Sequence, residues 1–192
     1  NIGIFYTETV TFSEAMWNKH INLLDEVWVP NKHSWSSLID DGLFVNNGIK
    51  VVPHPSDLIK FVGQSEQRID IPNINNTFKF YYIGDLNERK NLVSVIKCFH
   101  SEFDLHDDVS LIIKVKKFGQ APEDTVNDVN SICSAVKSRL RIYGQESYYR
   151  PEIVIGDNIP EEAVKTLHQY GDCFVCPSHG EAWSIPSFEA MA

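Results

Sequence analysis

The sequence has no long apolar run, no excess of positive charge and no glycine-rich dinucleotide motif. No stretch approaches the roughly 18 to 20 apolar residues that a membrane-spanning helix needs. Lysine and arginine number 17 against 26 aspartates and glutamates, so we expect no nucleic-acid partner, which would require a basic face to displace counterions. A Gly-x-Gly-x-x-Gly run, which a generic dinucleotide-binding domain would carry, is also missing. These absences leave an acidic protein of ordinary hydrophobic content.

Cysteine is scarce, with four residues in 192. The one close pair, Cys173 and Cys176, stands in a short apolar run that is typical of a buried strand. Residues three apart on a strand point to opposite faces, so the two sulfur atoms should diverge. No second Cys or His pair with zinc spacing is nearby. We therefore expect reduced core thiols, as in a cytoplasmic protein, with a redox or zinc site as the alternative.

What is present is a regular alternation of strands and helices. Strands are predicted at residues 2–7, 26–30, 49–52, 78–83, 109–115, 152–155 and 173–176, and helices at 13–24, 31–39, 90–103, 122–140, 160–170 and from 186 onward. Strands that alternate with helices of ten or more residues imply parallel pairing through crossover connections. Residues 56–76 have no strong period and indicate a linker or exposed loop. The prediction is an α/β protein of two units, and we expect the strands near 78, 109, 152 and 173 to be neighbours in one parallel sheet.

The first unit is expected to be only partial, because residues 1–75 contain three strands of what should be a larger sheet. An exposed sheet edge there should be covered by a neighbour or pair with another chain, so self-association is one expectation. The chain starts without Met and stops in the first turns of a helix. Both features suggest part of a longer protein.

In parallel sheets of this kind, ligands bind at the carboxyl ends of the strands. One such end carries a glycine and two cations: Gly84 permits a sharp exit from the strand, and Asn87 can cap the next helix. Arg89 and Lys90 then fall in the first turn of that helix, where cations are disfavoured unless an anion joins them. A bound phosphate would satisfy both side chains. A pair of solvated surface cations is the alternative.

A second strand end carries two glutamates. Glu181 would sit on the loop after the strand at 173–176, and Glu189 in the first turn of the helix that follows. Two carboxylates at such a mouth can accept hydrogen bonds from sugar hydroxyls. The alternative is that Glu189 only complements the dipole of its helix.

Three segments of the chain resemble family 4 (group 1) glycosyltransferases, which have the GT-B fold. Residues 27–34 and 49–57 resemble the end of the family's N-terminal domain, and residues 82–91 the opening strand and phosphate-binding turn of its C-terminal domain. Residues 176–192 are similar to the family's signature of two glutamates separated by seven residues. The resemblance implies two Rossmann-like units with parallel sheets. Residues 1–75 would end the acceptor-side domain and residues 76–192 would form a truncated nucleotide-sugar-binding domain.

The resemblance also implies roles for single residues. Arg89 and Lys90, on the turn that Gly84 opens, would bind the donor diphosphate. Glu181 would be the catalytic glutamate that contacts the transferred hexose, and Glu189 would bind the ribose. Backbone amides on the intervening loop would face sugar and phosphate oxygens, namely those of Ala182, Trp183, Ser184 and Ile185. Two further candidates are His179 for the sugar pocket and Lys114 for the donor phosphates.

The activity implied is hexosyl transfer from a nucleotide sugar, with retention and without a metal or cofactor. The acceptor would be a glycan, a lipid or a small molecule, and a membrane-surface location of a longer protein stays open. We expect the isolated chain to be inactive, because the acceptor-binding half is mostly missing. The alternatives are a GT-B nucleotide-sugar epimerase-like enzyme and a non-catalytic α/β nucleotide-binding module.

The chain departs from the family pattern at two places. Asp85 stands where the family often has arginine, which would either remove one phosphate-binding cation or transfer its role to Arg89. Ala182 and Ser184 replace smaller residues and carry Cβ atoms that restrict the backbone. The donor pocket is therefore expected to differ in shape.

Overall fold

The computed structural model describes the chain except residues 10, 13–15, 44–47, 64, 66–70 and 72–76. The chain divides into two compact units: unit 1 is Asn1–Ser56 with Gly180–Ile185, and unit 2 is Asp57–His179 with Pro186–Ala192. The boundary expected at residue 75 lies outside the described residues. Among the helices that are described, none combines the length and apolar character needed to cross a bilayer.

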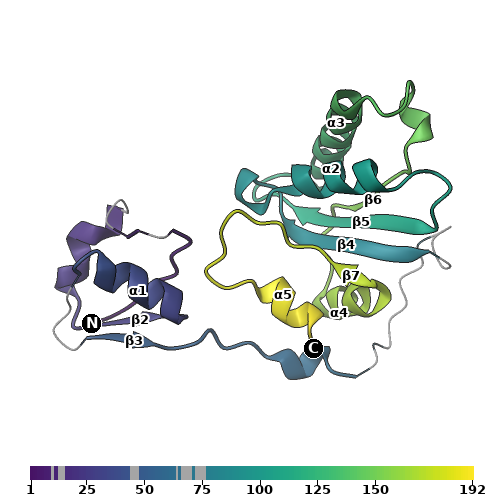
Figure 1. Cartoon of the computed structure of the whole chain (residues 1–192). Coiled ribbons are helices and arrows are strands. Elements are labelled where there is room, and N and C mark those ends of the chain that lie inside the picture. Colours follow the sequence, from purple (N-terminus) through teal and green to yellow (C-terminus); the bar gives the residue numbers. More distant parts are fainter. Residues whose placement is uncertain (10, 13–15, 44–47, 64, 66–70, 72–76) are drawn as a thin grey trace. The chain divides into compact units, whose positions relative to one another are not determined.

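Unit 1 contains a parallel sheet in the order β1-β2-β3 (Figure 1). Its elements are β1 (Ile2–Ile4), the 3-10 helix η1 (Met16–Leu23), β2 (Glu26–Val29), α1 (Lys32–Asp40) and β3 (Ile49–Val51). Asn31 caps α1 as predicted, because its side chain accepts a hydrogen bond from the Ser34 amide at 2.8 Å. The helix predicted at 13–24 is a 3-10 helix in its described part, and residues 13–15 lie outside that part.

Unit 2 contains a parallel sheet in the order β6-β5-β4-β7. Its strands are β4 (Phe78–Asp85), β5 (Val109–Lys116), β6 (Ile153–Ile155) and β7 (Cys173–Phe174), and its α-helices are α2 (Leu92–Glu102), α3 (Pro122–Leu140), α4 (Glu161–Tyr170) and α5 (Ile185–Ala190). Unit 2 also contains three short 3-10 helices among its described residues, η2 (Leu58–Phe61), η3 (Glu88–Lys90) and η4 (Glu146–Tyr148). The predicted neighbourhood of the four strands is confirmed, and so is the α/β class with parallel sheets.

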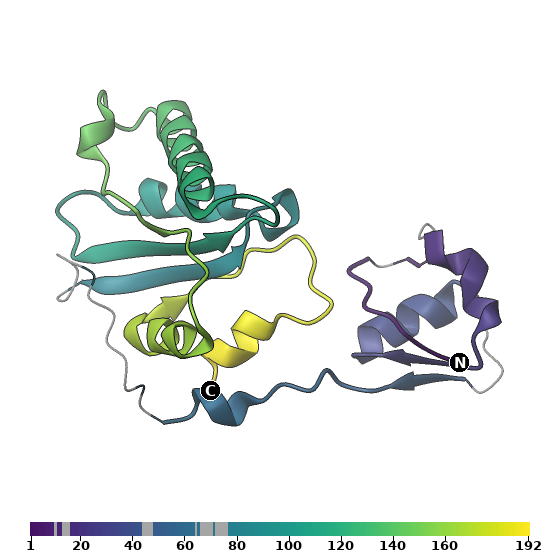
Figure 2. The same cartoon turned by 180° about the vertical axis from the view of Figure 1, so that it is seen from behind.

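Helices cover both faces of this sheet. Helices α2 and α3 lie on one face and α4 and α5 on the other, as the front and back views show (Figures 1 and 2). Residues 111–115 of β5 are therefore fully buried although their side chains alternate between the faces. Ile113 packs among residues of α2 and α3, whereas Ile112 packs with Tyr81 and Leu167 on the α4 face. A strand buried on both faces explains the continuous apolar run in the sequence.

A buried ionic cluster lies between α2, α3 and the residue before β6. The Glu152 carboxylate is 2.5 Å from His100 Nε2 and accepts a hydrogen bond from Lys137 Nζ at 2.7 Å. All three side chains are at most 7% exposed. Burial raises the pKa of Glu152, but the hydrogen bonds from His100 and Lys137 outweigh burial and lower it to about 2. Burial also raises the pKa of the neighbouring Cys133 thiol.

Two expectations are wrong in part. In the segment at 56–76, the side chains of Phe61 and Ile71 are buried, so these residues are not an exposed loop; residues 64, 66–70 and 72–76 lie outside the described part. Of the four cysteines, only Cys133 is buried, while Cys98 and Cys176 are exposed. Cys176 is exposed because β7 ends at Phe174, two residues earlier than predicted.

The two sheets should differ in amide hydrogen exchange. Ile2 and Ile4 of β1 are 55% and 61% exposed, whereas β4 and β5 pair over eight positions, of which only Phe78 at one end and Lys116 at the other are exposed. We expect amides of β1 and β3 to exchange at least about tenfold faster than those of β4 and β5, measured by mass spectrometry on the monomer. Raising the protein concentration should slow exchange in β1 or β3 if these strands pair with a second copy. Equal protection of both sheets in the monomer would contradict the expectation.

Candidate functional site

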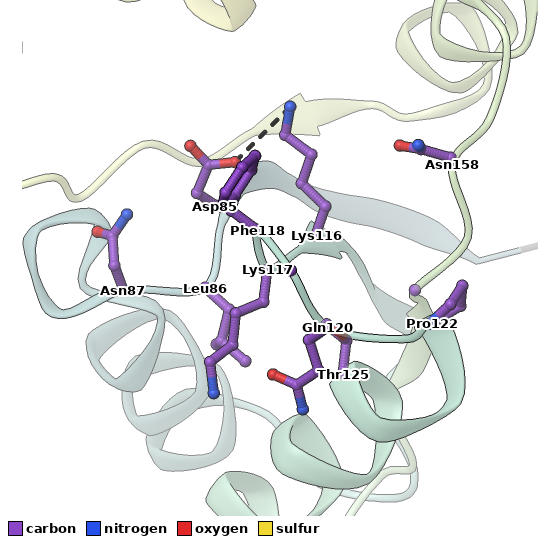
Figure 3. A pocket seen from close by; sticks show the side chains of 12 residues that line it. Asp85, Leu86, Asn87, Lys116, Lys117, Phe118, Gln120, Pro122, Thr125 and Asn158 are labelled. Carbon is purple, nitrogen blue, oxygen red and sulfur yellow. Dashed lines mark ion pairs between the residues drawn. The ribbon is translucent and has the colours of Figure 1, made fainter.

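A cavity of about 610 Å³ lies at the carboxyl ends of β4, β5 and β6. Its walls come from the segments after these strands and from the start of α3 (Figure 3). The polar side chains that line it include Asp85, Asn87, Lys116, Lys117, Gln120 and Asn158. The carboxyl-end rule thus predicted three of its walls. The segment after Cys176, which the rule also indicated, does not line this cavity.

The cavity carries both signs of charge. Lys116 Nζ lies 3.9 Å from the Asp85 carboxylate, the ion pair drawn in Figure 3. Lys117 donates to Asp128 at 2.9 Å, and this hydrogen bond lowers the pKa of Asp128. Phe118 is fully exposed beside these lysines. Sequence reasoning indicated this segment but did not single out its side chains, since two lysines and a phenylalanine in a turn match no motif.

The Arg-Lys turn is a separate 3-10 helix rather than the first turn of α2. Asn87 caps it, because its side chain accepts a hydrogen bond from the Lys90 amide at 3.1 Å. Asn91 then adopts φ 54°, in the left-handed region, and α2 starts only after it. Arg89 and Lys90 therefore stand on a short turn between β4 and α2. A left-handed residue interrupts the helix that the apolar spacing predicted to start at Lys90.

Gly84 shapes this turn by lacking a side chain. It is the seventh residue of β4, and a Cβ atom there would lie 2.7 Å from the Tyr82 hydroxyl. That hydroxyl donates to the Lys90 carbonyl at 3.5 Å. A larger residue at position 84 would displace Tyr82 and with it the support of Lys90. The predicted glycine is thus needed for a close approach.

The loop after β7 is hydrogen-bonded to the Arg-Lys turn. The His179 amide donates to the Arg89 carbonyl at 2.8 Å, and the Asn91 side chain donates to the Pro177 carbonyl at 3.1 Å. The structure therefore brings together Arg89, Lys90 and His179, which lie about 90 positions apart in the sequence. Of the two predicted glutamates, Glu189 belongs to unit 2, where its carboxylate lies 3.5 Å from His168 Nε2.

The rest of the predicted glutamate segment belongs to unit 1. The Ala182 carbonyl accepts a hydrogen bond from the Asn31 side chain at 2.7 Å. The Trp183 ring stacks on His54 with the ring centroids 6.3 Å apart, and its indole N–H donates to Ser56 at 3.4 Å. The Ile185 amide donates to the Trp183 carbonyl, so it is already engaged within the loop. Glu181 and Ser184 belong to the same segment and unit, and both are half-buried.

Lys114 is buried rather than a surface lysine. It lies on β5 between Ile83 and Ile155 of the neighbouring strands and is 7% exposed. Its ammonium donates to the Val115 carbonyl at 3.3 Å. Burial lowers the pKa of Lys114, Lys116 lowers it further, and Asp157 and Asp85 oppose the change. Among the described residues this is the one hydrogen bond of the ammonium, so the group has donors left for a ligand.

Comparison with known proteins identifies the fold. No protein-family model and no curated protein matches the sequence. Among solved structures, the OtsA apo structure has a TM-score of 0.73 at 10% identity, over 98% of this chain and 49% of that one. A trehalose-6-phosphate structure from E. coli, bound with UDP-2-fluoro glucose, has a TM-score of 0.69 at 10% identity. The match covers 98% of this chain and 49% of that one.

An α,α-trehalose-phosphate synthase (UDP-forming) from Burkholderia vietnamiensis also has a TM-score of 0.69, at 9% identity, with coverages of 98% and 48%. The chain spans about half the length of these structures. The likeness confirms Rossmann-like units of the GT-B class. At such identity it establishes the fold alone.

Proposed function

We propose that this chain carries the nucleotide-sugar-binding part of a glycosyltransferase. The observation that supports this most is the hydrogen bond from the His179 amide to the Arg89 carbonyl. It joins the Arg-Lys turn to the start of the glutamate-bearing segment, residues 176–192. The E. coli structure of similar fold is bound with UDP-2-fluoro glucose, and the protein from B. vietnamiensis is described as UDP-forming. A nucleoside diphosphate sugar is therefore the donor class that we assign to the chain.

In this proposal the two cations bind the diphosphate. Arg89 and Lys90 would neutralise the charge that develops on the departing phosphate, a contribution that needs fixed donors more than covalent chemistry. Asn87 both caps their turn and lines the adjoining cavity. A ligand held at the turn can therefore extend into that cavity. Lys114 would add a third cation from the carboxyl end of β5.

Within the GT-B class we propose a retaining, metal-independent hexosyltransferase of family 4. The spacing of Glu181 and Glu189 supports this assignment, as does the Arg-Lys turn after the first strand of unit 2. Glu189 would accept hydrogen bonds from the ribose and Glu181 from the transferred hexose. The acceptor would be a glycan, a lipid or a small molecule, and the protein would be cytoplasmic or bound at a membrane surface.

The two glutamates provide the test. Glu189→Ala should weaken binding of a nucleoside diphosphate and of its sugar-bearing form by about tenfold, because both contain the ribose. Glu181→Ala should weaken only the sugar-bearing form, by a similar factor, and leave the nucleoside diphosphate unchanged. Calorimetric titration of UDP, GDP and ADP and of the corresponding nucleotide glucoses would measure both.

Glu162→Ala is a suitable control, because this half-buried glutamate lies in the first turn of α4. It should leave all the affinities within about twofold. If both glutamate variants lose every ligand equally, or lose only folding stability, their assigned roles are wrong. If the unaltered chain binds none of the nucleotides, the proposed function itself is wrong.

A further inference from the structure

We infer that His168 is a positioning residue that holds the Glu189 carboxylate in place for the donor's ribose. This inference rests on the proposed function, since it takes Glu189 as a donor-binding residue. His168 lies on α4 and its side chain is 5% exposed. Its Nδ1 atom lies 3.1 Å from the Tyr81 hydroxyl, and its Nε2 atom lies 3.5 Å from Glu189 Oε2. The three side chains form one polar line from β4 through α4 to α5.

The two partners of His168, the Glu189 carboxylate and the Tyr81 hydroxyl, decide which nitrogen of the imidazole carries the proton. An ionised carboxylate only accepts hydrogen bonds, so the imidazole nitrogen that faces Glu189 must carry a proton. In a neutral ring Nδ1 is then the acceptor, and the Tyr81 hydroxyl is the donor. Burial, with a smaller contribution from Cys173, raises the pKa of Tyr81 to about 12, which keeps that hydroxyl protonated. Tyr81 thus selects the tautomer whose N–H points at Glu189.

Three aromatic rings hold the imidazole in this orientation. The rings of Phe61, Tyr81 and Phe174 lie 5.8, 5.6 and 6.0 Å from His168, measured between centroids. They come from three different segments of unit 2, so the imidazole cannot turn without displacing one of them. The Nε2 atom is buried and makes no hydrogen bond within the described residues, and the nearest charged oxygen that faces it is Glu189 Oε2 at 3.5 Å. A buried donor in this position favours any ligand that draws the carboxylate toward it.

A contact with His168 restricts the rotation of the Glu189 side chain, which stands on a short helix and is partly exposed. Helix α5 has six residues, and the Glu189 side chain is 19% exposed. A glutamate side chain left to rotate would lose conformational entropy when it binds a ligand, and this loss would weaken binding. A carboxylate that already lies beside the buried Nε2 of His168 avoids part of that loss.

The test compares two substitutions that differ in one hydrogen-bond donor facing Glu189. His168→Phe keeps an aromatic ring but removes both nitrogens, whereas His168→Gln keeps an N–H donor near the position of Nε2. We expect His168→Phe to weaken the tightest binder among UDP, GDP and ADP by about 5- to 30-fold, and His168→Gln to stay within about threefold of the unaltered chain. Binding of inorganic pyrophosphate, which has no ribose, should change by less than twofold in both. Tyr81→Phe should weaken the nucleotide less than His168→Phe does.

A double-mutant cycle separates positioning from packing. In the Glu189→Ala background, His168→Phe should have no further effect on nucleotide affinity, because the carboxylate that it would position is gone. Additive losses, a loss of pyrophosphate binding, or no rescue by glutamine would each overturn the inference while leaving the role of Glu189 intact. If Glu189→Ala itself leaves nucleotide binding unchanged, or if no nucleotide binds, the proposed function fails and the inference falls with it. Urea unfolding of each variant identifies any change that is only a loss of stability.

Discussion

Replacing both Arg89 and Lys90 by alanine is expected to weaken binding of a nucleoside diphosphate by about 100-fold or more. Hydrogen bonds to charged groups are worth about 1.5 to 3 kcal/mol each, and 1.4 kcal/mol corresponds to a factor of ten. Since both side chains stand on the short turn that Asn87 caps, the double substitution removes two charge-assisted contacts without altering β4 or α2. Calorimetry at low salt would measure the loss, and higher salt should reduce the affinity of the unaltered chain more than that of the variant.

A matched control removes the same charge elsewhere. Lys97→Ala with Arg139→Ala takes two exposed cations from α2 and α3. This control should leave the affinity within about threefold. If it weakens binding as much as the substitutions in the turn, the long-range field of the unit holds the ligand and the Arg-Lys turn is not a binding site.

The second large effect concerns stability and the buried ionic cluster. Glu152→Gln leaves the buried Lys137 ammonium without its buried counter-charge, and we expect a loss of about 3 kcal/mol in the free energy of unfolding at pH 7. Urea titration would measure it. Glu146→Gln is the control, because this carboxylate lies 3.8 Å from the same ammonium but is 53% exposed. It should cost less than about 1 kcal/mol.

The same cluster predicts a pH dependence. The pKa of Glu152 is lowered from 4.5 to about 2 in the folded chain. A carboxyl group whose pKa is lower in the folded state stabilises the fold above its unfolded pKa, and this stabilisation is lost as the pH falls through the folded value. The stability difference between the unaltered chain and Glu152→Gln should therefore be constant above about pH 5 and shrink between about pH 4.5 and pH 2. A difference that persists at pH 2 would show that Glu152 acts through packing and not through its charge.

Sequence reasoning located the elements well where local chemistry decides them. The bounds of α3 were predicted as observed, because Pro122 suits a first helical turn and the apolar spacing continues to Leu140. The parallel pairing around β5 followed from the alternation of strands and helices in the sequence. The start of α2 was misjudged, since a left-handed Asn91 is not implied by its neighbours.

Only those residues of the candidate site that belong to a sequence motif could be predicted. The Arg-Lys turn stands out because it combines a strand end with charged residues, and Glu189 stands out because it follows Glu181 at the spacing of the family signature. His168 has no such signal: it is one residue of an amphipathic helix, and its partners lie 87 positions before it and 21 after it in the chain. The burial of Lys114 could not be predicted either. A lysine in an apolar strand indicates the end of that strand, and only the positions of the neighbouring strands show that this lysine is covered.

The order of the strands in unit 2 bears on how the unit folds. Where β4 meets β5, a hydrogen bond joins Thr77 and Ser110, which are 33 positions apart in the sequence. Where β4 meets β7, a hydrogen bond joins Lys79 and Asp172, which are 93 positions apart. Closing the longer loop costs about 1 kcal/mol more in chain entropy, so β7 and α5 should join a sheet that already exists. During synthesis, β4 to β6 can pair before the glutamate-bearing segment has left the ribosome. A nucleotide that binds only the completed edge would then favour the final step of assembly and act as a folding aid as well as a substrate.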